Sequence, residues 1–228
     1  VEGEFHSSDE DSVIPLSWVE AANERWRVWD DAGRPPLDGR RVVGVDVARS
    51  GSDKTVMAIR HGHCVMELRT TSKEDTMETT GRVKGIVDAV TNVGMLPVVD
   101  VIGIGAGVVD RLREEGHEVE AFNASEGTRR KDATGELGFV NCRSGSWWNL
   151  RELLDPSKGG ETMLPPDDML TGDLTAPHWR VMSGGKIQVE SKDDIKKRLG
   201  RSTDHGDSVC MAFWSLEMKW REEYGVIN

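Results

Sequence analysis

The chain has 228 residues, of which 37% are hydrophobic and 30% charged, a composition typical of one globular domain or of a domain with an arm. Its net charge of −11 argues against tight binding of nucleic acid by this chain alone. No apolar run approaches membrane-spanning length, and the three isolated cysteines, with no CxxC pair, argue against a disulfide framework or a zinc site. Since the chain begins with Val, we expect a fragment or a processed chain without a signal peptide.

The first 40 residues are predicted to form an arm. Apolar positions in IPLSWVEAANERWRVW recur at helical spacing, with Ser17 as the expected N-cap and Glu20 completing a capping box. The following GRPPLDG is typical of a linker. We therefore place a domain boundary at residue 40, between an arm (1–40) and a domain (41–228).

The next elements predict a mixed α/β sheet. The pattern of RVVGVDVA is typical of a buried strand, and KTVMAIRHG and HCVMELRT are predicted to be two strands of a hairpin around Gly62. A helix within 74–93, the strand LPVVDV, the helix VVDRLREEG and the strand HEVEAFNA follow. A hairpin followed by a crossover to a parallel strand predicts a mixed sheet with helices on its faces.

The last third adds helices and a second hairpin. SGSWWNLRELLD is predicted to be a helix, and the Pro-, Gly- and Asp-rich segment 156–177 is expected to be irregular. HWRVMSGGKIQVES predicts a hairpin, KDDIKKRLG a short basic helix, and the run after Asp204 a helix with one apolar stripe.

Acidic residues lie at the ends of three hydrophobic elements. Asp46 interrupts the first strand, Asp100 ends LPVVD, and Asp204 and Asp207 open the last helix. Converging carboxylates repel one another and are best tolerated around a divalent cation, so their joint placement favours a metal-dependent phosphoryl-transfer site.

Each acid also has a structural interpretation, which the sequence leaves open. Asp46 could bond the following loop, although Asp53 suits that role better, and Asp100 could cap the helix after the glycines. Asp204 and Asp207 could be the N-cap and N3 residues of the last helix.

Other motifs give weaker signals. IGIGAG has GxGxG rather than GxGxxG, no P-loop motif occurs, and His205 between the late acids is interpreted as incidental. The pair Trp147 and Trp148 indicates core or interface. Two basic clusters are either solvated faces or DNA contacts: Arg129, Arg130 and Lys131, and then Lys192, Lys196, Lys197, Arg198 and Arg201.

Four segments in order carry a family resemblance: GVDVARSGSDKT, VVDVIGIGAGVVDRL, SWWNLRELL and KIQVESKDDIKKRLGRSTDHGDSVCMAFW. Together they resemble the C-terminal nuclease domain of the large terminase subunit of tailed bacteriophages. The opening segment resembles the piece that links the motor ATPase to the nuclease. Thr203 replaces the family's usual Pro and Ser208 its usual Ala, and both changes leave the acids in place.

The resemblance implies an RNase H-like fold: a mixed five-stranded sheet flanked by helices, with an additional β-hairpin. It implies a two-metal endonuclease using Mg²⁺ or Mn²⁺, in which Asp46 on the first strand bridges both ions, Asp100 is the fourth-strand ligand, and Asp207 with Asp204 completes the site. One ion would activate water and the other would stabilise the leaving 3′ oxygen.

The same resemblance implies cleavage of double-stranded viral DNA concatemers during genome packaging. It places the chain in the host cell cytoplasm, transiently at the procapsid, with no membrane contact. The implied partners are double-stranded DNA, the ATPase domain, the portal and the small terminase subunit. Because no P-loop is present, we interpret the chain as the nuclease domain without its ATPase.

Three alternatives stay open at this stage. A RuvC-like junction resolvase would prefer branched DNA and dimerise stably. An actin-like sugar kinase or ATPase would hydrolyse ATP, although 228 residues are short for its two phosphate-binding units. A non-catalytic acidic docking module of a packaging motor would bind divalent ions weakly or not at all.

Overall fold

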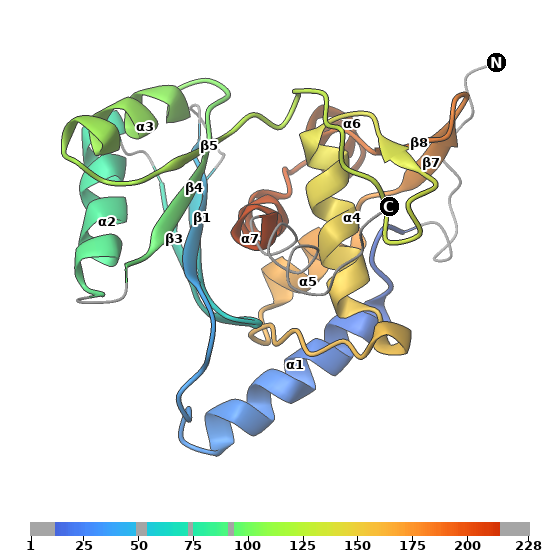
Figure 1. Ribbon diagram of the computed structural model, residues 1–228, viewed down its shortest axis with the longest axis horizontal. Coiled ribbons are helices and arrows are strands. Elements are labelled where there is room, and N and C mark those ends of the chain that lie inside the picture. The colour runs from blue at the N-terminus through green and yellow to red at the C-terminus, as the bar shows by residue number, and fades with distance from the viewer. Residues whose placement is uncertain (1–11, 49–53, 73–74, 91–93, 215–228) are drawn as a thin grey trace.

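A five-stranded mixed sheet forms the centre of the computed structural model, which describes residues 12–48, 54–72, 75–90 and 94–214 (Figure 1). The strand order is β3-β2-β1-β4-β5. β1 pairs antiparallel with β2 and parallel with β4, while β2–β3 is an antiparallel hairpin and β4–β5 a parallel pair. The strands are β1 (Arg41–Asp46), β2 (Thr55–His61), β3 (Cys64–Thr71), β4 (Leu96–Asp100) and β5 (Glu120–Phe122).

Alternation along the strands sends side chains to two different cores. In β1, Val43 and Val45 join one apolar cluster, whereas Val42 joins the other. Helices α2 (Thr76–Asp88) and α3 (Gly105–Glu114) cover the Val43 face. The opposite face is covered by α7 (Asp204–Trp214), with α4 (Cys142–Leu154) and α5 (Asp168–Thr175) behind it (Figure 1). Burial on both faces explains why β1 carries no polar side chain between Arg41 and Asp46.

The contact between α7 and β1 depends on Gly44. A Cβ at this position would lie 2.1 Å from the carbonyl oxygen of Ser208 and 2.6 Å from the backbone nitrogen of Ala212. Any larger residue would push the helix off the strand, because both of these neighbours are backbone atoms. The glycine therefore lets the middle of α7 lie directly against β1.

A second, smaller sheet has the order β6-β8-β7. Its strands β7 (Trp179–Met182) and β8 (Lys186–Val189) form the expected hairpin, and the short β6 (Gly138–Phe139) adds to β8 in parallel. The 3₁₀ turn η2 (Pro156–Lys158) follows α4, and helix α6 (Lys192–Leu199) follows β8. Ser191 caps α6 by accepting from the backbone nitrogen of Asp194.

The predicted arm packs against the main domain. Helix α1 (Leu16–Asp31) buries Val19 and Ala22 in the same apolar cluster as α7. Trp26 donates from its indole nitrogen to the carbonyl of Val65 at 2.9 Å. Residues 12–31 are thus part of the core, while their assignment to a linker from an ATPase domain stays a prediction.

Most predicted elements are confirmed, and two details were wrong. Helix α1 begins after Pro15 without a side-chain cap, so the Ser17–Glu20 capping box does not form. The segment expected to be irregular contains α5, whose N-cap Asp167 accepts from the backbone nitrogen of Leu170. In addition, no strand was predicted where β6 forms. None of the helices in the described ranges is long and apolar enough to span a membrane.

Candidate active site

The ends of two parallel strands place Asp46 and Asp100 side by side. The register pairs Gly44 with Val98 and Val45 with Val99, so the next step along both strands reaches the two acids. Both occupy the alternation positions that face α7 rather than α2 and α3. The carboxyl ends of parallel strands are where sites form in open α/β sheets.

The glycine-rich segment after β4 has a steric role at this edge. A Cβ at Gly105 would lie 1.8 Å from the carbonyl oxygen of Asp100, and Gly103 has φ of 85°. These glycines allow a tight turn between β4 and α3. The carboxylate of Asp100 accepts from the backbone nitrogen of Ile102 at 3.0 Å, which fixes it within that turn instead of capping α3.

Asp204 and Asp207 lie in the first turn of α7, which is anchored by a buried acid. Asp173 of α5 is inaccessible to solvent and accepts from the backbone nitrogens of His205 at 2.9 Å and Gly206 at 3.3 Å. It also forms an ion pair with Arg201. Asp173 therefore satisfies the free N–H groups at the start of α7 and sets the position of both catalytic candidates.

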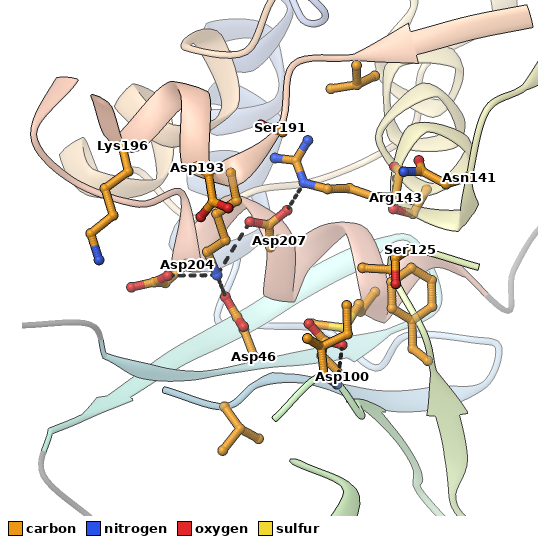
Figure 2. A pocket seen from close by; sticks show the side chains of 18 of the residues that line it. Asp46, Asp100, Ser125, Asn141, Arg143, Ser191, Asp193, Lys196, Asp204 and Asp207 are labelled. Atoms are coloured by element: carbon orange, nitrogen blue, oxygen red, sulfur yellow. Dashed lines mark hydrogen bonds and ion pairs between the residues drawn. The ribbon is translucent and has the colours of Figure 1, made fainter. Parts of the chain in front are cut away.

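All four predicted acids line one cleft of about 430 Å³. Its wall is completed by α4, the end of β8 and the start of α6, which supply Arg143, Ser191 and Lys192 (Figure 2). The apolar part of the lining comes from Val47, Ile102, Phe122 and Met211. Elements from both ends of the sequence thus converge on a single cleft.

The ammonium of Lys192 lies among three of these carboxylates, and dashed lines mark its ion pairs to the labelled Asp46, Asp204 and Asp207 (Figure 2). Its Nζ is 2.6 Å from Asp46 Oδ2, 2.9 Å from Asp204 Oδ1 and 3.7 Å from Asp207 Oδ2. The Lys192 side chain is 34% exposed, against 6% for Asp46, so it reaches the acids from the cleft side. Asp100 lies apart from these ion pairs.

The cluster shifts the protonation equilibria of its members. Burial raises the pKa of Asp46 to about 7 against the opposing charge of Lys192, and the neighbouring carboxylates add to the rise. Burial acts the same way on Asp204, but Lys192 and the Ser202 hydroxyl outweigh it and lower the pKa of Asp204. Burial alone would lower the pKa of Lys192, yet the three carboxylates raise it, so the residue stays an ammonium.

The donor set fits a divalent cation. Within the described ranges no three His, Cys, Asp or Glu side chains could hold a metal ion as they stand. Lys192 provides the positive charge between Asp46, Asp204 and Asp207. Their carboxylates are hard oxygen donors, the type of ligand that Mg²⁺ and Mn²⁺ prefer.

The predicted basic clusters divide between the cleft and other contacts. Lys192 and Lys196 line the cleft, whereas exposed Lys197 pairs with Asp194. Arg198 holds Glu190 through Nη2 at 2.6 Å, and Arg201 holds Asp173. The earlier basic cluster does not line the cleft; its residues are Arg129, Arg130 and Lys131.

Two residues of the site were missed by sequence reasoning. Arg143 lies 3.3 Å from Asp207 through Nε, and the Trp147 indole donates to the same carboxylate at 2.8 Å. Their spacing of four on a helix was visible, but nothing local linked α4 to the last helix. His205 is buried and contacts Thr70 of β3 at 3.1 Å, consistent with a structural role. Asp53 lies outside the described residues.

Comparison with known proteins agrees on the fold. The sequence matches no family model and has no significant match among curated proteins. A mutant of the large terminase subunit of bacteriophage Sf6, with calcium, is 22% identical at a TM-score of 0.70, covering 88% of this chain and 98% of that chain.

A manganese-containing mutant nuclease domain of the same Sf6 subunit has a TM-score of 0.69 at 21% identity, covering 88% of this chain and 98% of that chain. The chain has the fold of large terminase nuclease domains. The terminase nuclease of thermophilic phage G20c, with bound magnesium, is 16% identical at a TM-score of 0.55, covering 79% and 82% of the two chains. The RNase H-like mixed sheet with its added hairpin is thereby confirmed.

Proposed function

We propose that this chain is a divalent-metal-dependent endonuclease that cuts double-stranded phage DNA during genome packaging. The observation that carries the proposal is the single cleft lined by Asp46, Asp100, Asp204 and Asp207, with an ammonium held among three of them. Fold neighbours that are terminase nuclease domains support the same interpretation.

In this proposal the four acids would hold two Mg²⁺ or Mn²⁺ ions, which would supply activation of a water molecule and stabilisation of the leaving 3′ oxygen. Asp46, the most deeply placed carboxylate of the cluster, would bind between Asp100 on β4 and the acids of α7. Lys192 would release its carboxylates as the cations bind, because its side chain approaches from the open side of the cleft.

DNA would approach along the α6 side of the cleft. Lys196 lines the cleft beside Lys192, and Lys197 is exposed on the same helix. The other basic residues of the two clusters stay proposed DNA contacts of lower rank, since Arg198 and Arg201 are already held by Glu190 and Asp173. With a net charge of −11, the chain would bind DNA weakly alone and depend on the ATPase domain, portal and small subunit of the motor.

The test is cleavage of supercoiled plasmid with Mg²⁺, Mn²⁺, Ca²⁺ or a chelator. We expect linearisation and then degradation with Mg²⁺ and Mn²⁺, with Mn²⁺ at least as effective because it tolerates imperfect geometry. Asp207→Asn is the matched inactive control. Cleavage that persists in excess chelator, or in this variant, would overturn the proposal.

Further assays on the same protein separate the alternatives. A junction resolvase would cut a four-way junction far faster than the plasmid. A kinase or ATPase would release phosphate from ATP. An acidic docking module would show neither cleavage nor a rise in melting temperature with Mn²⁺.

A further inference from the structure

Helix α4 directs two side chains to one carboxylate of the site, one as a hydrogen-bond donor and one as an ion-pair partner. Arg143 and Trp147 are four residues apart, so they lie on the same face of the helix, one turn from each other. Both are buried, and both reach Asp207 of α7. Asn141 caps α4 by accepting from the backbone nitrogen of Ser144 at 2.9 Å, which fixes the turn that carries Arg143.

The Asp207 carboxylate is held on both of its oxygens. Oδ1 accepts from Trp147 Nε1 at 2.8 Å and lies 3.3 Å from Arg143 Nε, while Oδ2 accepts from the Thr203 hydroxyl at 2.9 Å. Lys192 is farther from it than from the other two acids, at 3.7 Å. Asp207 is therefore oriented mainly by groups other than the cleft ammonium.

The Trp147 indole has little freedom to move. It is fully buried, and a Cβ at Gly206 would lie only 2.8 Å from its Cη2 atom. The ring thus packs directly on the first turn of α7. A buried indole N–H requires an acceptor, and Asp207 Oδ1 is the acceptor that the structure gives it.

Arg143 joins the three segments that meet behind the cleft. Its guanidinium donates to the carbonyl of Glu190 at the end of β8 and to the Thr203 hydroxyl before α7. Its Nε forms the ion pair with Asp207. The residue therefore links the start of α6, which carries Lys192, to the start of α7.

We propose that Trp147, supported by Arg143, is a positioning residue that orients Asp207 for cation binding before any cation arrives. This rests on the proposed function of the cleft. A donor on the outer side of a carboxylate fixes its rotamer and leaves its remaining lone pairs directed at the metal position. Loss of the indole donor should weaken Mn²⁺ binding about 10- to 100-fold, the range for outer-shell partners.

The first measurement needs no metal and no DNA. In the ¹⁵N–¹H spectrum of the chelator-treated protein, the Trp147 indole resonance should move in Asp207→Asn, while that of Trp148 stays in place. Trp148 is the matched reference because it is the next residue of α4 and packs on Trp179 instead. An unmoved Trp147 resonance overturns the proposed role whether or not the chain cuts DNA.

The second measurement is Mn²⁺ titration followed by melting temperature and by plasmid cleavage. Trp147→Phe should raise the half-saturating Mn²⁺ concentration in both readouts, whereas Trp148→Phe should change it less than about twofold. If Trp147→Phe does not fold, Thr203→Val removes the donor to Oδ2 and should raise the same concentration. A folded Trp147→Phe or Thr203→Val with the wild-type half-saturating Mn²⁺ concentration overturns the proposed positioning role. The proposed function of the cleft would still stand in that case if the wild type is active and Asp207→Asn is inactive.

Discussion

The two faces of the central sheet are built from different chemistry. The face under α2 and α3 buries aliphatic side chains such as Val43, Val109 and Leu112. The face under α7 also buries charges, among them Arg60 and Asp173, both fully inaccessible. The first face gains stability mainly from burial of apolar surface, whereas each charge on the second is costly unless it is paired or hydrogen-bonded.

Arg60 shows how the second face meets that cost. It lies near the end of β2 and donates from Nε to the carbonyl of Ala212 at 2.7 Å, and its guanidinium lies 5.1 Å from the Phe213 ring. Burial lowers its pKa to about 10, which still leaves it charged at neutral pH. The α7 face therefore retains buried charges where an apolar core would suffice for folding.

The largest expected effect is on chemistry. Asp46→Asn should lower plasmid cleavage by on the order of 10³-fold or more, since it removes the carboxylate that we propose binds both metal ions. The melting temperature of the metal-free variant should stay equal or rise, because one charge leaves a repelling cluster. Cleavage rate and melting temperature measured on one preparation check this, and an unfolded or fully active variant contradicts the assignment.

The next largest effect is on stability, and it compares the two faces of the sheet directly. Leu112→Ala on α3 and Asp173→Ala on α5 should each lower the free energy of unfolding by about 3 kcal/mol, the first by leaving a cavity and the second by leaving buried donors unsatisfied. Cleavage per folded molecule should fall only in Asp173→Ala, because Asp173 anchors the first turn of α7. Urea unfolding and cleavage assays below the transition give both quantities. Equal cleavage in the two variants would erase the functional difference between the faces.

A smaller effect is stabilisation by metal. Mn²⁺ at about 100 times its dissociation constant should stabilise the wild type by about 2.7 kcal/mol through binding to the native state. The rise in melting temperature should be much smaller in Asp100→Asn, and it should be retained in Leu112→Ala. Thermal melts with and without Mn²⁺ check this. The same rise in Asp100→Asn as in the wild type would place the ion elsewhere.

The smallest effect concerns DNA affinity. Lys196→Gln with Lys197→Gln should weaken DNA binding severalfold and reduce the slope of log affinity against log salt by about 0.9 for each phosphate that is no longer neutralised. Arg201 is left intact because its guanidinium pairs with Asp173. Arg113→Gln on α3 is the control on the opposite face. Filter binding at several salt concentrations measures the slope, and an unchanged slope would make α6 a solvated surface and favour the Arg129–Lys131 cluster.

Local patterns in the sequence were sufficient for most elements. Two-residue alternation and short apolar runs mark β1 to β4, and the apolar stripe after Asp204 marks α7, because both depend on neighbours within a few residues. The same locality explains the missed α5: Gly172 and the surrounding prolines favour a loop, and the helix forms because it packs against α7 and is capped by Asp167.

The sequence by itself determined that Asp46, Asp100, Asp204 and Asp207 end or open hydrophobic elements, which was enough to predict a metal site and, with the family resemblance, an RNase H-like sheet. Only the tertiary structure decided that Lys192 lies among the acids, that Trp147 holds Asp207, and that Arg201 serves Asp173. The physical reason is the separation along the sequence of the residues involved. Strand and helix periods depend on adjacent residues, whereas these contacts join segments that become neighbours only when α4, α5 and α6 pack around α7.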